Sequence, residues 1–233
     1  MRSIFSFLLL YAVKTVSRIF YRVEFRWVVP PPEKPWQGHR VLTFLNHTSL
    51  FEPIFAGGAP SSVLWNIASR GVLPVAQKTI DRPFVGLFFR LVARDVVSIT
   101  REPDHTWQAV LGKIGPDSMV VIAPEGRMMR ADGLDSNGNP MTVRGGIADV
   151  LQAIPEGRML LAYSNGLHHV QVPGQRLPRL FKRIRMNLEV VDIAEYREQL
   201  IAARKTGFKV RVKQDLTDRR DRYSKPGLDG IPI

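Results

Sequence analysis

The stretch RVLTFLNHTSLFEP, residues 40–53, joins a strand-like segment to a turn that carries a histidine and a carboxylate. Arg40–Leu45 is rich in β-branched and aromatic residues, which predicts a strand, and Asn46 and His47 follow it directly. Glu52 comes five residues after His47. Five residues of ideal helix rotate through about 140°, so the two side chains can meet only if His47 precedes the helix that contains Glu52.

This histidine and glutamate allow two interpretations. In one, the Glu52 carboxylate accepts the imidazole N–H, fixes the tautomer of His47 and stabilises the imidazolium, which makes His47 a general base for an alcohol or water nucleophile. In the other, the segment is an ordinary capping turn at the start of a helix. The spacing alone favours the capping turn, whereas the context along the chain favours the general base.

Beyond residue 40, strand signals and helix signals alternate. The predicted strands are Arg40–Leu45, Val92–Ile99, Met119–Ala123 and Met159–Tyr163, and the predicted helices include Asp104–Ile114 and Gly146–Ile154. This alternation predicts an α/β domain with a largely buried sheet, in which ligands collect at the loops after strand ends. Turn-forming residues predict an exposed loop at 132–140. Near the C-terminus, Phe208, Val210 and Val212 alternate with basic residues, which predicts an edge strand.

Composition narrows the class of protein. The 233 residues are 45% hydrophobic and 23% charged, which suits one sizeable folded domain. The absence of cysteine excludes a disulfide framework, a thiolate metal site and a cysteine nucleophile. A mean hydropathy of −0.07 excludes a polytopic membrane protein. The net charge of +12 indicates anionic partners: nucleic acid, an acidic membrane surface or phosphorylated substrates.

The N-terminal segment predicts an amphipathic helix on a membrane surface. Ile4–Val13 is apolar except for Ser6, and this run is shorter than the ~20 residues that a bilayer span requires. Basic residues then recur at every fourth position opposite an apolar face: Lys14, Arg18 and Arg22 against Leu9, Ala12, Val16, Ile19 and Val23. Such a helix lies among lipid headgroups and is attracted by anionic lipid. A signal peptide and an ordinary core-packing helix are the alternatives.

These patterns divide the chain into four predicted parts. Residues 1–29 form the membrane-associating helix, and the proline-rich residues 30–38 form a stiff linker. Residues 39–215 form the main domain, and residues 216–233 form a basic C-terminal tail. We therefore expect the linker to separate the N-terminal helix from the main domain.

Three short segments follow one another along the chain. The first contains Asn46, His47, Ser49 and Glu52, the second contains Lys78, Pro83, Phe84, Gly86, Val96–Ile99 and Arg101, and the third is Val120–Gly126, with Gly145-Gly146 after it. In this order they resemble the motifs of the glycerophospholipid acyltransferase family. The first segment resembles Asn-His-x-Ser-x-x-Asp, with glutamate in place of the commoner aspartate, the second resembles the family's second motif, and the third resembles Phe-Pro-Glu-Gly-Thr-Arg-Ser. Gly145-Gly146 falls where the family has a glycine that opens the next helix. The resemblance spans residues 41–163, about half of the chain.

Two departures from the family pattern leave the substrate open more than the reaction. Arg127-Met128-Met129-Arg130 replaces the Thr-Arg pair of the third motif, so that a cation would come from Arg127 or Arg130 at a shifted position. Residues 161–164, LAYS, contain no proline, whereas the fourth motif of the family normally has an apolar residue followed by proline.

The resemblance implies an α/β fold with a glycerolphosphate-acyltransferase-like mixed sheet flanked by helices, and residues 39–215 as the acyltransferase domain. It implies transfer of a fatty acyl group from acyl-CoA or acyl-carrier protein to a hydroxyl of a lysophospholipid, above all 1-acylglycerol 3-phosphate, with His47 and Glu52 as the catalytic dyad. It implies no covalent acyl-enzyme, no metal and no other cofactor, and a place on the cytoplasmic face of the cell membrane. The implied substrate-binding residues are Asn46, Ser49, Lys78, Arg101, Glu125, Gly126, Arg127 and Arg130.

The chemistry of the residues agrees with a phosphorylated acceptor. A phosphomonoester carries close to two negative charges, which suits the planar guanidinium of Arg101 supported by Lys78. An acyl tunnel would need apolar walls, and Phe84, Leu87, Phe88 and Leu91 are the predicted ones, although a plain core helix explains them as well.

Other functions remain as alternatives. One is another lysolipid O-acyltransferase, acting for example on a lyso-ornithine lipid, and a second is a lipid-binding protein that has lost catalysis on the same fold. A nucleic-acid-binding protein would need stacking aromatic residues on a basic face. The basic C-terminal third has few and scattered ones, namely Phe181, Tyr196, Phe208 and Tyr223, so we expect no nucleic-acid partner.

Overall fold

The computed structural model describes residues 1–100, 102, 104–172, 175, 177–202, 206–225, 231 and 232. The strands are β1 (Tyr21–Trp27), β2 (His39–Leu45), β3 (Gly71–Ala76), β4 (Asp95–Ile99), β5 (Met119–Ile122), β6 (Arg158–Ser164), β7 (Lys182–Asp192) and β8 (Ile231–Pro232). The helices are α1 (Arg2–Phe20), a 3₁₀ helix η1 (Glu52–Gly57), α2 (Ser61–Arg70), α3 (Gln77–Ile80), α4 (Pro83–Val92), α5 (His105–Leu111), α6 (Gly146–Ala153), α7 (Ile193–Ala202) and α8 (Phe208–Tyr223).

The strands form one mixed sheet in the order β4-β3-β5-β2-β6-β7-β1-β8. From β4 to β6 all neighbours are parallel, β7 is antiparallel to β6, β1 is parallel to β7, and β8 is antiparallel to β1. Parallel strands end at the same edge of a sheet, so the loops that follow β2, β3 and β5 come together there. The prediction of an α/β fold with a mixed sheet flanked by helices is confirmed.

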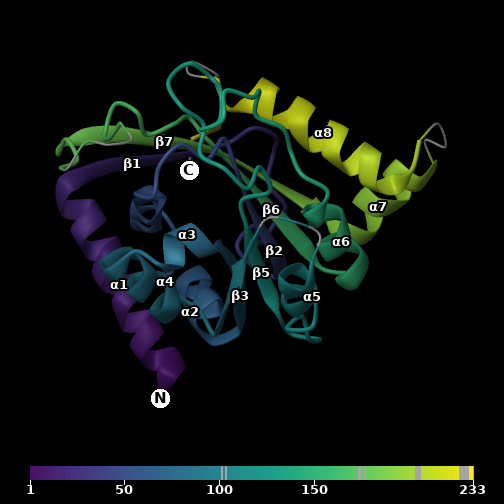
Figure 1. The fold of residues 1–233 in the computed structure, drawn as a ribbon, viewed down its shortest axis with the longest axis horizontal. Coiled ribbons are helices and arrows are strands. Elements are labelled where there is room, and N and C mark those ends of the chain that lie inside the picture. The colour runs from purple at the N-terminus through teal and green to yellow at the C-terminus, as the bar shows by residue number, and fades with distance from the viewer. Residues whose placement is uncertain are drawn as a thin grey trace.

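Helices cover both faces of the sheet and create two cores (Figure 1). Successive residues of β2 point to opposite faces, as in any strand. Val41 and Leu45 pack in the core beneath α5, α6, α7 and α8, whereas Leu42 packs in the core on the side of η1 and α2. A further cluster, which includes Leu10 and Leu64, joins α1 to α2 and α4. Because β2 is buried on both faces, the turn after it has a rigid base.

The predicted C-terminal edge strand is wrong, because Phe208–Tyr223 forms the helix α8. The alternation of apolar and basic residues covers only a short window at the start of this segment. Over its full length, Val212, Leu216 and Arg220 recur every fourth residue and are all buried, so one face of a helix packs on the domain. The predicted boundary at residue 216 lies inside this helix.

The predicted extent of the N-terminal helix is also wrong. The helix α1 ends at Phe20, and Tyr21–Trp27 forms β1, which pairs with β7 within the main sheet. The segment YRVEFRW alternates apolar and charged residues, and this period of two outweighs the fourfold recurrence of basic residues that extends to Arg22. Residues 30–38 therefore connect two strands of one sheet and do not separate an appendage from the domain.

The amphipathic character of α1 is the reverse of that of a soluble helix. Its polar Lys14 and Ser17 are buried against the domain, and the Lys14 ammonium donates to the Ala59 carbonyl oxygen at 2.8 Å. Most of the large side chains turned outward are apolar and 46–62% exposed, namely Ile4, Phe5, Leu8, Tyr11, Val16 and Ile19, and the polar Thr15 and Arg18 are exposed beside them. Within the described part of the chain, α1 is the one helix whose length and hydropathy suffice to cross a membrane.

Candidate active site

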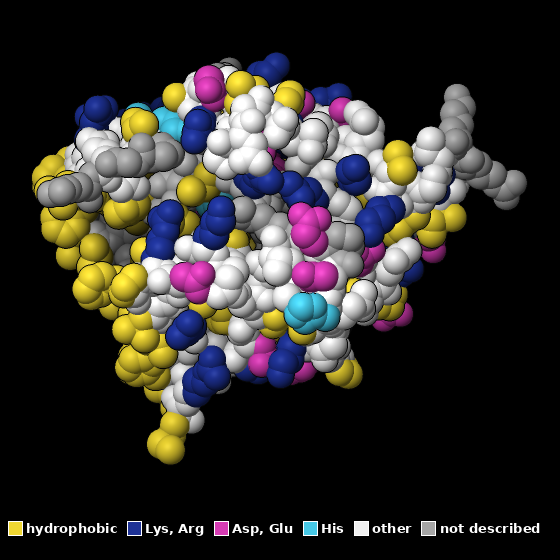
Figure 2. Space-filling view, viewed as in Figure 1, with side chains coloured by type: hydrophobic (Ala, Val, Ile, Leu, Met, Phe, Trp, Pro, Cys, Tyr) yellow, Lys and Arg dark blue, Asp and Glu magenta, His cyan; other side chains and the backbone are white. Residues whose placement is uncertain are grey.

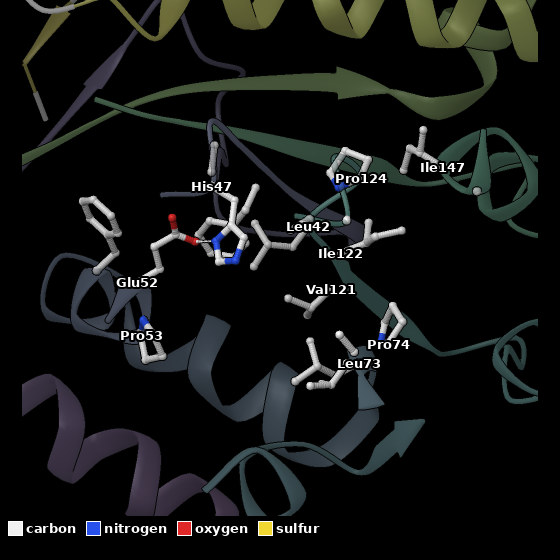
Figure 3. A pocket seen from close by; sticks show the side chains of 18 of the residues that line it. Leu42, His47, Glu52, Pro53, Leu73, Pro74, Val121, Ile122, Pro124 and Ile147 are labelled. Atoms are coloured by element: carbon white, nitrogen blue, oxygen red, sulfur yellow. Dashed lines mark hydrogen bonds and ion pairs between the residues drawn. The ribbon is translucent and has the colours of Figure 1, made fainter. Parts of the chain in front are cut away.

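The turn after β2 presents His47 to a cavity at the edge of the sheet (Figure 3). Asn46 has a left-handed backbone, with φ of 61°, which asparagine adopts more readily than most residues. Its side-chain amide donates to the Ser164 carbonyl oxygen of β6 at 2.7 Å, and this bond fixes the turn to the neighbouring strand. The left-handed residue ends β2 and redirects the chain.

His47 and Glu52 form a direct pair. The distance from His47 Nδ1 to Glu52 Oε2 is 2.5 Å, and the Thr48 N–H donates to Glu52 Oε1 at 2.8 Å. Glu52 is the first residue of η1, and His47 lies in the turn before it. The carboxylate therefore caps the turn with one oxygen and holds the imidazole with the other, so both interpretations of this segment fit the same arrangement. Because a carboxylate accepts hydrogen bonds, Nδ1 carries the proton and Nε2 carries the lone pair.

A second carboxylate supports the same turn from the loop after β5. Glu125 Oε1 accepts the Asn46 N–H at 3.0 Å, and Glu125 Oε2 accepts the His47 N–H at 2.9 Å. The carboxylate is buried, and Arg220 Nη1 lies 3.2 Å from Oε1. Burial raises the pKa of Glu125, while the His47 N–H and the Arg220 guanidinium oppose that rise. Glu125 thus binds the backbone of Asn46 and His47 in the turn after β2.

The cavity beside this pair has a volume of about 750 Å³. On one side of His47 its walls are apolar side chains from β2, β3, β5, α2 and α4, including Leu42, Val63, Ile67, Leu73, Phe88 and Val121. The remaining walls carry polar and charged groups, among them Glu102, Arg127, Arg144, Asp149, Lys209 and Lys213. The cavity thus combines apolar walls with charged walls in which four basic side chains outnumber the two carboxylates Glu102 and Asp149, a combination that fits an amphipathic anionic ligand.

The predicted site residues fall into three groups. His47, Ser49, Glu52, Gly126 and Arg127 line the cavity. Asn46 and Glu125 are buried behind the turn and bond to it rather than to the cavity. Lys78 and Arg130 are exposed and do not line this cavity, and Arg101 lies outside the described residues.

Several predicted residues have roles in the local geometry. The Ser49 hydroxyl oxygen accepts the Phe51 N–H at 3.1 Å and so shapes the turn before η1. Arg127 donates from Nη1 to Asp135 Oδ2 at 2.8 Å, which ties the third-motif loop to the predicted exposed loop. Gly126 has φ of 67°, a left-handed conformation that glycine adopts without strain.

The apolar walls differ from those predicted. Of the four residues Phe84, Leu87, Phe88 and Leu91, only Phe88 lines the cavity. Phe84 and Leu87 are 88% and 57% exposed, because this face of α4 turns away from the sheet. The four predicted residues share one face of α4, whereas the face that α4 turns to the cavity carries Phe88, Phe89 and Val92.

Four basic residues of the site were missed by the sequence analysis: Arg144, Lys209, Lys213 and Arg220. Three of them lie on α8, which was predicted as an edge strand followed by a tail. The fourfold spacing of Val212, Leu216 and Arg220 was the signal that identifies the helix and its buried face.

The adjacent histidines His168 and His169 bond to main-chain oxygens: His168 to Met129 at 2.9 Å and His169 to Arg183 at 2.8 Å. Among the described residues, no group of three or more His, Cys, Asp or Glu side chains is placed to hold a metal ion.

The mixed sheet flanked by helices is an α/β fold, and a solved structure has a similar fold. The chain is similar to the crystal structure of the 1-acyl-sn-glycerophosphate (LPA) acyltransferase PlsC from Thermotoga maritima, with a TM-score of 0.55 and 13% sequence identity over 91% of this chain and 77% of that chain. This likeness establishes a PlsC-like fold. No protein-family model matches the sequence, and no curated protein sequence matches it.

Proposed function

We propose that the protein is an acyltransferase that moves a fatty acyl group from acyl-CoA or acyl-carrier protein to a hydroxyl of a lysophospholipid, 1-acylglycerol 3-phosphate in the first place, to give phosphatidate. The observation that carries the proposal is the 2.5 Å contact between His47 and Glu52 inside a cavity that is apolar on one side and cationic on the other. The similarity of the fold to an acyltransferase supports it.

The proposed reaction is a direct transfer. His47 Nε2 takes the proton of the acceptor hydroxyl while that oxygen attacks the thioester carbonyl carbon, and Glu52 stabilises the imidazolium that forms. The tetrahedral intermediate then collapses, the C–S bond breaks, and the imidazolium returns its proton to the leaving thiolate. The acyl group is never bonded to the protein, and His47 ends in its starting state.

The apolar part of the cavity is the proposed site for the acyl chain. Its walls come from both strands and helices, so a chain that enters beside His47 passes between the sheet and the layer formed by α2 and α4. Each methylene group removed from water contributes about 0.8 kcal/mol, so a long chain gains most of its affinity here.

The cationic part is the proposed site for the acceptor phosphate. Arg127, Arg144, Lys209 and Lys213 line it, whereas Lys78 and Arg130 do not. Lys209 is paired with Asp149 at 2.9 Å, and Lys213 has no ion-pair or hydrogen-bond partner of its side chain among the described residues. Glycines admit these side chains: a Cβ on Gly126 would lie 3.3 Å from Arg144 Cδ, and a Cβ on Gly145 would overlap Lys209.

The outward face of α1 is the proposed membrane contact. Its exposed apolar side chains continue to Trp65 of α2 and to Phe84 and Leu87 of α4, which are 43%, 88% and 57% exposed. Hydrophobic side chains gather along the left edge of the molecule, where α1 runs, in Figure 2. An apolar surface of this kind is typical of proteins that lie in a membrane interface. We place the protein on the cytoplasmic face of an anionic membrane, where a lysophospholipid acceptor is available.

The proposed function is tested by acyl transfer with purified protein in detergent, comparing wild type with His47→Ala. The donors are acyl-CoA and acyl-carrier protein, and the acceptors are lysolipids with and without a phosphate, a lyso-ornithine lipid among them. Turnover that His47→Ala abolishes supports the proposal, and the preferred acceptor identifies the headgroup. Folded wild-type protein that binds lipid but turns over no pair contradicts it and favours the lipid-binding alternative.

A further inference from the structure

Arg220 on the last long helix reaches the turn that carries His47. Arg220 Nη1 lies 3.2 Å from Glu125 Oε1 and also donates to the Met141 carbonyl oxygen at 3.0 Å. Glu125 in turn accepts the N–H groups of Asn46 and His47. A chain of direct contacts therefore runs from α8 through one carboxylate to the backbone of the proposed general base.

Because the Glu125 carboxylate is buried, its ionised form depends on the nearby Arg220 guanidinium. The Glu125 and Arg220 side chains are 1% and 10% exposed, so solvent screens neither of them well. A buried carboxylate without a cation takes up a proton more readily, and the hydroxyl oxygen of a protonated carboxyl group is a weaker acceptor whose proton needs a partner of its own. The ionised form of Glu125 offers each of the two N–H groups of the turn a charged acceptor oxygen, so it holds the turn more strongly than the protonated form.

The position of Arg220 follows from the packing of α8. Val212 and Leu216 on the same face are fully buried in the core beneath α6, and the next position of this face is Arg220. The guanidinium also contacts Asp221 at 2.8 Å, which uses its other nitrogens. The helix thus fixes Arg220 by apolar contacts that do not involve the cavity.

We propose that Arg220 is a positioning residue, which keeps Glu125 ionised so that Glu125 holds the left-handed turn at Asn46 and the His47 imidazole in register with Glu52. This inference rests on the proposed function, because the turn matters for rate only if His47 is the general base. It assigns to Arg220 a part in catalysis without contact with the substrate, in contrast to Lys209 and Lys213 of the same helix, which line the cavity. Arg220 from α8 and His47 from the turn after β2 act on the charge of Glu125, and Arg127, Asp135 and Arg144 line a small pocket together with it.

The test compares Arg220→Met, Arg220→Lys, Glu125→Gln and the double variant Glu125→Gln/Arg220→Met in the full chain. A misplacement of about 1 Å can cost about 100-fold in rate, so we expect Arg220→Met to lower kcat between about tenfold and 100-fold, with KM within about twofold of wild type. Arg220→Lys retains the charge and should recover part of kcat. The double variant should be no slower than Glu125→Gln, because Arg220 acts through Glu125.

The pH profile and a neighbouring control separate positioning from plain stabilisation. Loss of the guanidinium raises the pKa of Glu125 further, so the kcat of Arg220→Met should recover as the pH rises and Glu125 ionises. Arg219→Met is the matched control: Arg219 pairs with Glu189 and Asp215 on the same helix and does not contact Glu125. Its kcat and KM should stay within about twofold of wild type.

A readout without substrate distinguishes failure of this inference from failure of the proposed function. Hydrogen exchange of the Asn46 and His47 amides, followed by NMR, should become about tenfold faster or more in Arg220→Met and stay unchanged in Arg219→Met. Unchanged exchange of these amides, an unchanged kcat in folded Arg220→Met, or a double variant slower than Glu125→Gln would overturn the inference. If the wild-type protein transfers no acyl group but exchange of these amides is faster in Arg220→Met, the positioning contact is supported and only the proposed function is refuted. If Arg220→Met does not fold, Arg220→Lys and the double variant, which has no uncompensated charge, decide the question.

Discussion

Replacing Glu52 by glutamine decides whether His47 acts as a base or only belongs to a capped turn. Glutamine keeps one oxygen for the Thr48 N–H, which Glu52 Oε1 now accepts at 2.8 Å, so the turn keeps its cap. Its amide NH₂ then faces His47 Nδ1, which lies 2.5 Å from Oε2 in the wild type. An amide donor forces Nδ1 to accept, which moves the imidazole proton to Nε2 and removes the lone pair that the proposed reaction needs.

The expected loss follows from this change of tautomer. A positioned general base contributes about 10²–10⁴-fold to a rate, and the loss of the correct tautomer costs about 10⁴-fold in a serine protease triad. We expect the kcat of Glu52→Gln to fall about 10³-fold, which is about 4 kcal/mol of transition-state stabilisation at about 1.36 kcal/mol per factor of ten. The free energy of unfolding should change by no more than about 1 kcal/mol, because the cap survives.

The assay is the initial rate at saturating donor and acceptor, with urea unfolding of the same preparations. Glu52→Asp is the control, because it retains a carboxylate and therefore the Nδ1–H tautomer, and it should keep far more activity than Glu52→Gln. A Glu52→Gln variant with more than one tenth of the wild-type kcat would refute the general-base role. A loss of activity matched by an equal loss of stability would show that Glu52 only caps the turn.

Three further predictions concern the phosphate site, the membrane face and a buried histidine. Lys213→Met should raise the KM for a phosphorylated acceptor about fivefold to tenfold, since one exposed ion pair is worth about 1 kcal/mol. The KM for an uncharged lysolipid should stay unchanged in this variant. The control Lys78→Met should change the KM for neither acceptor. Phe5→Glu/Leu8→Glu should abolish co-sedimentation with anionic liposomes without lowering Tm by more than about 2 °C, because both side chains are exposed; continued binding would exclude α1 as the anchor. Burial lowers the pKa of His39 to about 4 from 6.5. The folded protein therefore binds fewer protons than the unfolded chain and should lose about 3 kcal/mol of stability as the pH falls from 6.5 to 4. His39→Gln, which can still donate to the Pro35 oxygen, should lack this slope in urea titrations, and equal slopes would contradict the assignment.

The parts of the site that the sequence predicts are local in the chain. Residues 40–53 contain the strand, the turn and both members of the His47–Glu52 pair, so the geometry follows from one strand end and one helix start. The α/β class could be predicted for the same reason, because β2, β5 and β6 each carry their own run of apolar residues. The strands β3 and β7 were not predicted, and the mixed sheet followed from the family resemblance alone. The third-motif residue Glu125 could be named, but its bonds to the Asn46 and His47 amides could not, because they depend on the register of β5 beside β2.

The parts that could not be predicted depend on packing between distant segments. Arg220 reaches Glu125 only because α8 packs against α6. The basic sequence of this segment, taken alone, fits an unstructured tail as well as a packed helix. Lys78 was assigned by its resemblance to the second motif, and Arg130 was suggested as a cation at a shifted position of the third, whereas the direction of a side chain depends on the helix or loop that bears it. The short alternation at Phe208 also shows that a window of a few residues cannot separate a strand from the first turns of a helix.

The construction of α1 links the two lipid-related parts of the proposed function. The helix is attached to the domain by the apolar contacts of Leu10 and by polar contacts, in which the Ser17 hydroxyl donates to the Ile54 carbonyl oxygen at 2.5 Å and Lys14 donates to Ala59. Because polar groups make part of the attachment, other apolar side chains remain on the outside, where Leu8 is 58% exposed, while Leu10 lines the cavity. A soluble helix would bury Leu8 and expose Lys14. The helix α1 thus carries both a side chain that lines the cavity, Leu10, and the exposed apolar surface that we assign to the membrane, so the proposed acyl-chain site lies beside the proposed membrane contact.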